Sequence, residues 1–286
     1  MTAEHVVLNG RLGPIGSAGI SVCDHGLTVG DGVFETVRVD HGSAFAVRRH
    51  LERLARSAHR LGLHCPPADV LRQEIALLLD ADRMRLGALA RLRLTLTGGQ
   101  GPLGSERRPG PGTRILAAAP SLPTVGAATL LLVDWRRPTR SALTGVKSTS
   151  YAENVIALAA ARRAGATEAL LLSDTGALCE GSGSNIVLHS RGRLRSPDLT
   201  SGCLPGITRE LVCTWFDVDQ CHLTLADLTR ADEVAITSSL RGLQPVDRVL
   251  AADGTVIWQA AGVGPGSTME RLAREFRQHA AADRDP

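Results

Sequence analysis

The chain has 286 residues and a formal net charge of +3, and its residues are 43% hydrophobic, 21% charged and 3% aromatic. This is the composition of a globular protein long enough for two domains, and the small, scattered positive charge argues against a nucleic-acid or membrane-surface patch. The apolar runs are short or broken by charge and no signal-peptide pattern is present, so we expect no transmembrane helix and a cytoplasmic location. The six cysteines form no C-x-x-C pair, which predicts reduced thiols and neither a metal site nor a disulfide framework.

The first part of the chain mixes short β-like runs with amphipathic helices. Helical spacing of apolar residues predicts helices over Arg49–Leu61 and Asp69–Ala81. The Gly/Pro-rich segment Gly98–Gly112 predicts an irregular loop of the kind used as a mobile lid. Alternating or bunched apolar residues predict strands over Val6–Asn9, Phe34–Val39, Ala44–Val47, Ala90–Thr97 and Thr113–Ala119.

The second part again mixes strands and helices. Helices are predicted over Ala152–Ala164, Gly206–Trp215 and Ser267–Ala281. Strands are predicted over Ala128–Asp134, Leu170–Ser173, Ile186–His189 and Glu233–Thr237. The pattern predicts an α+β (mixed α/β) protein of two domains. We expect a small α/β domain over residues 1–119, a linker over 120–125 and a larger, β-rich domain with helices over 126–286.

Lys147 is the only lysine of the chain, and the other 31 of its 32 basic residues are arginines. A guanidinium is always charged and cannot act as an amine nucleophile, whereas a desolvated lysine amine can condense with a carbonyl. Lys147 is therefore a candidate for Schiff-base chemistry. The alternative is a solvated surface charge, the usual position of a lysine.

Two further residues near small or polar neighbours are candidates for contact with an aromatic cofactor. Glu180 lies in a Cys-Glu-Gly-Ser-Gly-Ser-Asn run before a predicted strand, where small residues would let a ring approach. Tyr151 is the only tyrosine, four residues after Lys147, and its phenol could donate a hydrogen bond. An exposed turn glutamate and a buried structural tyrosine are the alternatives.

The segment Leu204–Arg209 leads directly into a predicted helix and offers an anion site. The unpaired amides of the first turn, the positive end of the helix dipole and the Thr208 hydroxyl would all favour a phosphate. Thr237–Ser239 could add donors, and Arg53 could add a charge. The alternatives are an ordinary helix start after Pro and Gly, and a surface arginine.

Pyridoxal phosphate requires a lysine, an acid beside its pyridine nitrogen, an anion site and a donor near its phenolic oxygen. The chain offers a candidate for each, and it resembles the class IV (fold type IV) pyridoxal-phosphate enzymes. That family includes branched-chain and D-amino-acid aminotransferases and 4-amino-4-deoxychorismate lyase. The resemblance covers nearly the whole chain and is carried by Asp24–Thr36, His50–Leu54, Gly145–Tyr151, Glu180–Asn185 and Leu204–Arg209.

The resemblance implies a homodimer of two-domain subunits that bind pyridoxal 5'-phosphate mainly through the larger domain. It implies Lys147 as the lysine of the internal aldimine and Glu180 as the partner of the pyridine nitrogen. Tyr151 is the least secure assignment, because its spacing from the lysine differs by one from some relatives. The residues implied or suggested as further cofactor contacts are Arg53, Leu204, Ile207, Thr208 and Ser239.

Three positions depart from the family pattern. Val29 stands where family aminotransferases often carry an aromatic residue, which would widen the substrate pocket. Leu240 replaces a common phosphate-binding threonine, so Ser239 or backbone amides would serve instead. Thr97-Gly98 replaces an Arg-Gly step and removes an arginine for the substrate carboxylate. Arg38 and Arg241 are therefore the candidates for that carboxylate, with surface charges as the alternative.

The predicted function is transfer of an amino group between an amino acid and a 2-oxo acid. A D-amino acid is favoured because the segments 30–35 and 181–185 look closer to D-amino-acid enzymes. A second hypothesis is 4-amino-4-deoxychorismate lyase, which releases pyruvate and 4-aminobenzoate and is similar at Leu143–Lys147 and Ser239–Gly242. A third is a non-catalytic protein that retains the fold, which the intact candidate residues argue against. No metal, nucleic-acid or membrane partner is expected.

Overall fold

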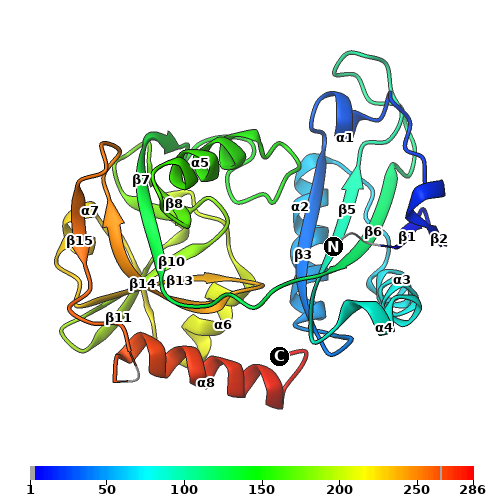
Figure 1. The fold of residues 1–286 in the computed structure, drawn as a ribbon. Helices are drawn as coiled ribbons and strands as arrows, with labels where there is room; N and C mark the ends of the chain where they lie inside the picture. Colours follow the sequence, from blue (N-terminus) through cyan, green and yellow to red (C-terminus); the bar gives the residue numbers. More distant parts are fainter. Residues whose placement is uncertain (1–3, 265) are drawn as a thin grey trace. The chain divides into compact units, whose positions relative to one another are not determined.

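The computed structural model describes residues 4–264 and 266–286. The chain divides into two compact units, which Figure 1 draws with their helices and strands. The first unit contains the residues up to Pro123 together with Val146–Tyr151 and Asp283–Pro286, and the second contains Thr124–Gly145 and Ala152–Ala282. The prediction of a mixed α and β fold is confirmed. The segment that carries Lys147 groups with the first unit.

The first unit is built on an antiparallel sheet. Among the described residues its strands lie in the order β2-β1-β6-β5-β3-β4. Every residue of β3 is paired with one of β5, from Gly32↔Thr97 to Asp40↔Leu89. The strands are β1 (His5–Leu8), β2 (Arg11–Pro14), β3 (Gly32–Asp40), β4 (Ser43–Ala44), β5 (Leu89–Thr97) and β6 (Thr113–Pro120).

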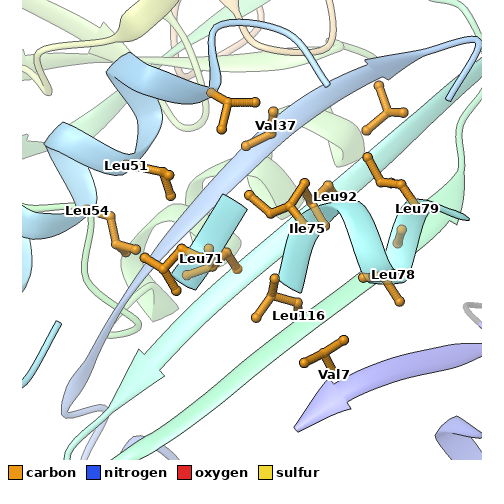
Figure 2. Close-up of a cluster of buried hydrophobic side chains, with 14 of the residues drawn as sticks. Val7, Val37, Leu51, Leu54, Leu71, Ile75, Leu78, Leu79, Leu92 and Leu116 are labelled. Carbon is orange, nitrogen blue, oxygen red and sulfur yellow. The ribbon is translucent and has the colours of Figure 1, made fainter. Parts of the chain in front are cut away.

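The core of the first unit lies between this sheet and the helices α2 (Val47–Leu61) and α3 (Ala68–Ala81). Figure 2 shows Leu54 of α2, Leu78 of α3 and Leu92 of β5 among the buried side chains of this cluster. Burial of each such leucine stabilises the fold by roughly 1.5–3 kcal/mol. The shorter helices are η1 (Ile15–Ser17), α1 (His25–Thr28) and α4 (Arg83–Leu86).

One predicted strand of this unit is wrong. The sequence predicts a strand over Ala44–Val47, but β4 ends at Ala44 and α2 begins at Val47. Ala46 has a left-handed backbone (φ 55°, ψ 39°), which lies outside the β region and interrupts a regular strand. The apolar residues of this run are buried, so the hydrophobic signal was real, but it belongs to the turn into a helix.

The second unit is built on a sheet that closes on itself. Its strands follow the order β12-β11-β10-β13-β14-β7-β8-β9, and β9 also pairs with β10 through Glu180↔Asn185. β15 adds to β14 at one side. The strands are β7 (Ala128–Arg137), β8 (Glu168–Ser173), β9 (Leu178–Gly181), β10 (Asn185–Ser190), β11 (Arg193–Pro197), β12 (Asp219–Cys221), β13 (Glu233–Ser238), β14 (Gly242–Leu250) and β15 (Val256–Gln259).

Helices of the second unit connect and cover these strands. The helix α5 (Ala152–Arg163) joins the parallel pair β7 and β8 and buries Ala157 and Ala161 against them. The others are η2 (Leu199–Ser201), α6 (Ile207–Trp215), α7 (Leu225–Thr229) and α8 (Thr268–Ala282). Within the described ranges, none of the helices is both long and apolar enough to cross a bilayer.

Candidate active site

The strand β3 sorts the candidate residues of the first unit onto two faces of its sheet. Successive side chains of a strand point to opposite faces, so Phe34 and Glu35 face different surroundings. Glu35 lies on the face shared with the buried residues Val33 and Val37, against α2. Phe34 lies on the other face, together with Lys147. The two neighbours of one strand therefore organise two different groups of side chains.

Lys147 is held beside β3 by backbone hydrogen bonds. The Phe34 N–H donates to the Lys147 carbonyl at 2.9 Å, and the Thr149 N–H donates to the Gly32 carbonyl at 2.8 Å. The Lys147 Nζ lies 4.4 Å from the centroid of the Phe34 ring and 5.5 Å from that of Tyr151. Tyr151 packs edge-on against Phe34 at 5.2 Å between centroids. The structure thus brings the predicted residues Lys147 and Tyr151 together around one aromatic ring.

Arg93 of β5 lies on the same ring, and the sequence did not single it out. Phe34 is paired with Thr95, which makes Arg93 its diagonal neighbour on the same face. The guanidinium carbon of Arg93 lies 3.2 Å from the Phe34 centroid. Burial lowers the pKa of Arg93 to about 10, so it remains charged at neutral pH. No carboxylate in the described part of the chain forms an ion pair with it.

Behind this face, Glu35, His50 and Arg53 form a buried network, the Glu35 network. Arg53 donates from Nε and Nη2 to the two carboxylate oxygens at 2.8 and 2.6 Å, and His50 Nδ1 lies 2.7 Å from Oε2. All three residues are at most 3% exposed. Burial alone would raise the pKa of Glu35, but the charge and hydrogen bonds of Arg53, with those of His50, lower it to about 2. Burial also lowers the pKa of His50, although Glu35 opposes this.

The loop 98–112 contains no helix or strand, as predicted. Arg107 anchors it through two hydrogen bonds of 2.5 and 2.6 Å to the carboxylate of Asp31. Val29, the position predicted to widen the substrate pocket, ends α1 and is 45% exposed. Asp24 caps α1 by accepting from the Gly26 N–H at 2.8 Å. Whether the loop moves as a lid stays a prediction.

In the second unit, Glu180 lies near the end of β9 with its carboxylate buried and oriented by a hydrogen bond and an ion pair. Its Oε2 accepts from the Leu204 N–H at 2.9 Å, and Arg137 Nε lies 3.2 Å from Oε1. Asn185, paired with Glu180 across β9 and β10, donates from Nδ2 to the Leu204 carbonyl at 2.9 Å. Two of the predicted cofactor residues, Glu180 and Leu204, are therefore in direct contact within this unit.

The start of α6 presents backbone N–H groups that could bind a ligand. The first amides of a helix have no intrahelical partner, and Gly206, which precedes Ile207 and Thr208, has no side chain to cap them. A Cβ on Gly206 would collide with Asn185 Oδ1. Thr237 is paired with Asn185, so their side chains share a face of the sheet. Its Oγ1 is buried with no hydrogen-bond partner among the described residues. These groups suit a bound anion.

Arg241, predicted for the substrate carboxylate, pairs with Glu168 at 2.5 Å. Glu168 is fully buried and also accepts from the hydroxyls of Ser182 and Ser184. Ser239 begins the turn between β13 and β14 that carries Arg241. This Glu168 cluster, defined by Glu168, Arg241, Ser182 and Ser184, ties the turn before β10 to the turn before β14.

The sequence did not identify Glu35, His50, Arg93, Arg137 or Glu168 as site residues. Glu35 and His50 both lie inside motifs that carried the family resemblance, so those motifs held a usable signal. Arg93 had none. Arg91 and Arg93 occupy the same face of an alternating strand, and only tertiary packing distinguishes the exposed residue from the one on Phe34.

Comparison with known proteins gives consistent matches. Residues 32–249 match the family model Amino-transferase class IV. A "Putative branched-chain-amino-acid aminotransferase" of Methanocaldococcus jannaschii is 36% identical over 88% of this chain and 89% of that protein. A D-alanine aminotransferase of Bacillus licheniformis is 29% identical over 90% and 91% of the two chains. An aminodeoxychorismate lyase of Bacillus subtilis is 28% identical over 85% and 86%.

A solved structure covers almost the whole fold. The T.th. branched-chain amino acid aminotransferase with pyridoxamine 5'-phosphate superimposes with a TM-score of 0.88 at 26% identity, over 99% of this chain and 95% of that one. The family model spans most of the chain, and the M. jannaschii relative exceeds 30% identity over nearly all of it. The chain is thus an enzyme that belongs to the class IV aminotransferase family, which the resemblance of its motifs predicted.

Proposed function

We propose that this protein is a pyridoxal-phosphate-dependent aminotransferase that moves an amino group between an amino acid and a 2-oxo acid. The observation that carries the proposal is the position of Lys147. The only primary side-chain amine of the chain is half-buried against the rings of Phe34 and Tyr151 and held in place by β3. An amine in such a setting is partly desolvated, which favours its use as a nucleophile and base.

The residues present fit pyridoxal phosphate. The start of α6 offers backbone amides for a phosphate, and Thr237 Oγ1, which has no partner among the described residues, offers a hydroxyl. The buried carboxylate of Glu180 offers an anion for a protonated pyridine nitrogen. We assign the phosphate to Arg53, Ile207 and Thr208, with Thr237 and Ser239 as further donors. Lys147 would hold the group covalently through Nζ.

When bound, this group supplies an electron sink that stabilises negative charge on the substrate Cα. Once the substrate amine has displaced it from the cofactor, the freed Lys147 Nζ would remove the proton from that carbon and return it on the cofactor side, as a general base and then a general acid. Glu180, fixed by Leu204 and Arg137, would keep the proton on the pyridine nitrogen. Tyr151 would donate from its phenol to the neighbouring oxygen. These roles remain predictions for each named residue.

We assign the substrate carboxylate to Arg93. Arg38 and Arg241 were the sequence candidates, but each has a carboxylate partner inside its own unit: Asp40 for Arg38 and Glu168 for Arg241. Arg93 has none among the described residues and lies on the same Phe34 ring as Lys147. A guanidinium in this position is available for a bidentate contact with a carboxylate.

A preference for D-amino acids is part of the proposal. It is supported by the similarity of segments 30–35 and 181–185 to D-amino-acid enzymes and by the D-alanine aminotransferase among the relatives. The test is a single-turnover absorption spectrum of cofactor-loaded protein mixed with D-alanine or D-glutamate without a 2-oxo acid. We expect conversion of the cofactor band to that of pyridoxamine phosphate, and no conversion in a Lys147→Ala variant. An unchanged wild-type band with D-amino acids and full conversion with L-amino acids would contradict the stereochemical preference.

The second candidate is 4-amino-4-deoxychorismate lyase. It is supported by the similar residues Leu143–Lys147 and Ser239–Gly242 and by the Bacillus subtilis relative. The same Lys147 base would then lead to loss of pyruvate in place of amino transfer. Pyruvate and 4-aminobenzoate released from aminodeoxychorismate, with no transamination of D- or L-amino acids, would replace the first proposal by this one.

Two further features of the protein stay predictions. The family resemblance implies a homodimer, which light scattering coupled to size-exclusion chromatography would test against a 30.2 kDa monomer. The composition predicts a cytoplasmic location.

A further inference from the structure

The helix α2 begins without a cap of its own, although it carries His50 and Arg53 of the Glu35 network. Its N-cap residue, Ala46, offers no side-chain acceptor, and its first turn contains no acidic residue. Arg48 and Arg49 stand there instead, close to the positive end of the helix dipole. A helix start of this kind is prone to fray. His50 lies within this first turn, where its N–H donates to the Ala46 carbonyl at 3.1 Å.

The last four residues of the sequence, Asp283–Pro286, supply what α2 lacks. Asp285 Oδ1 accepts from the Arg48 N–H at 2.7 Å, the same amide that a capping side chain would bind. The Arg284 carbonyl accepts from the Ala46 N–H at 2.7 Å. The Pro286 carbonyl accepts from Arg49 Nε at 2.8 Å. One segment therefore binds the N-cap amide and one first-turn amide of α2 and also places a carboxylate at the positive end of the helix dipole.

The same segment is fixed to the rest of the first unit. Asp285 Oδ2 accepts from Arg72 of α3 at 2.7 Å. Arg284 donates to the Ser43 carbonyl at 2.8 Å and to Asp40 at 3.2 Å, at the hairpin between β3 and β4. Its guanidinium also lies 5.7 Å from the centroid of Phe45. These contacts hold Asp285 at the start of α2. They connect the segment to α2, to α3 and to the hairpin between β3 and β4.

We propose that Asp285 is a positioning residue for the cofactor site, acting as a cap supplied to α2 from a distant segment of the chain. By holding the first turn of α2 it fixes His50, and through the next turn Arg53, on Glu35. The proposal rests on the proposed function in one respect, the assignment of Arg53 to the phosphate. Asp285 itself touches neither substrate nor cofactor in this scheme, and its effect reaches the site through α2.

The test measures two quantities in the full-length protein: hydrogen exchange of the α2 amides and the dissociation constant of pyridoxal phosphate. In Asp285→Ala we expect the amides of Arg48, Arg49 and His50 to exchange about tenfold faster, and the dissociation constant to rise by about the same factor. Asp285→Asn keeps an acceptor and loses the charge, so about a threefold change in each is expected. This milder variant decides the question if the alanine variant does not fold.

Asp227→Ala is the matched control. Asp227 is the N3 residue of the capping box that Thr224 begins at α7 in the second unit, a helix that carries none of the proposed site residues, so its loss should alter neither quantity. Unchanged α2 exchange in the Asp285 variants would overturn the capping role. Faster α2 exchange with an unchanged dissociation constant would overturn the positioning role and leave the proposed function standing. Wild-type protein that takes up no pyridoxal phosphate would overturn both the proposed function and the cofactor role of Asp285. The hydrogen exchange of α2 would still show whether Asp285 caps that helix.

Discussion

Glu35 and Glu168 are the most deeply buried glutamates of the two units among the described residues, and the two are neutralised in different ways. Glu35 in the first unit is held by Arg53 and His50, both as inaccessible as the carboxylate itself. Glu168 in the second unit is held by Arg241, whose side chain is 22% exposed, and by serine hydroxyls. In the first network the cation is almost completely shielded from water, while in the second it stays partly exposed. We therefore expect the same Glu→Gln substitution to lower the free energy of unfolding by different amounts in the two units.

The largest effect is expected from Glu35→Gln. Removing the charge leaves the Arg53 guanidinium buried without a counterion, and breaking a buried pair in this way costs about 3–5 kcal/mol of unfolding free energy. The pKa of about 2 for Glu35 gives a compatible figure of roughly 3 kcal/mol for its ionised form. Urea denaturation of the variant measures this cost. Glu52→Gln, at an exposed position of α2, is the surface control and should change stability little.

Glu168→Gln should cost less, about 1–3 kcal/mol. Arg241 can turn toward solvent when its partner is neutral. The glutamine oxygen can still accept from one of the two serine hydroxyls, which donate to different oxygens of Glu168, and the other hydroxyl can rotate to accept from the new amide group. Urea denaturation of Glu35→Gln and Glu168→Gln compares the two clusters. If both variants unfold with the same dependence of free energy on urea concentration, the difference between their midpoints gives the difference in stability cost. Equal or reversed costs would show that exposure of the cation does not set the penalty.

A pH dependence specific to the first unit should follow from His50. Its pKa is lowered by burial, so below its ordinary value of 6.5 the unfolded chain binds a proton that the folded chain does not. The free energy of unfolding should then fall as the pH drops below 6.5, with a slope of at most about 1.4 kcal/mol per pH unit. The Glu35 contribution is complete above pH 4.5 and is lost toward pH 2, because its folded pKa is the lower one. His50→Gln should remove the loss of stability below pH 6.5 and leave the loss toward pH 2.

A comparison of the two units also shows what the sequence could predict. Long segments with a regular period were predicted correctly: α2, α3, β5 and β6 in the first unit and β7, α5 and β13 in the second. The strands β2, β9, β11, β12, β14 and β15 were missed, because each is short or interrupted by polar residues and is defined by its pairing with other strands. Periodicity within a few residues carries no information on such partners.

The candidate site shows the same limit. Lys147 could be selected because its residue type is unique in the chain, and Glu180 and Thr208 because their motifs have a fixed order. Arg93 could not, since the composition contains 31 arginines and its role depends on packing against Phe34. The sequence also did not indicate the ion-pair partners of Arg38 and Arg241. Arg38 pairs with Asp40, two residues along the chain, and Arg241 pairs with Glu168 of β8.

The smallest change in stability, and the sharpest test of the second unit, is expected from Thr237→Val. The Thr237 hydroxyl is buried and has no partner among the described residues, so an isosteric methyl group should leave the cofactor-free protein as stable or up to about 1 kcal/mol more stable. If the hydroxyl donates to a bound phosphate, the variant should bind pyridoxal phosphate about tenfold more weakly, since a hydrogen bond to a charged acceptor is lost. Thermal denaturation without cofactor and a cofactor titration separate the two effects. Stability that falls while affinity is unchanged would mean that Thr237 serves the packing of β13, and the phosphate site would then depend on the first amides of α6 alone.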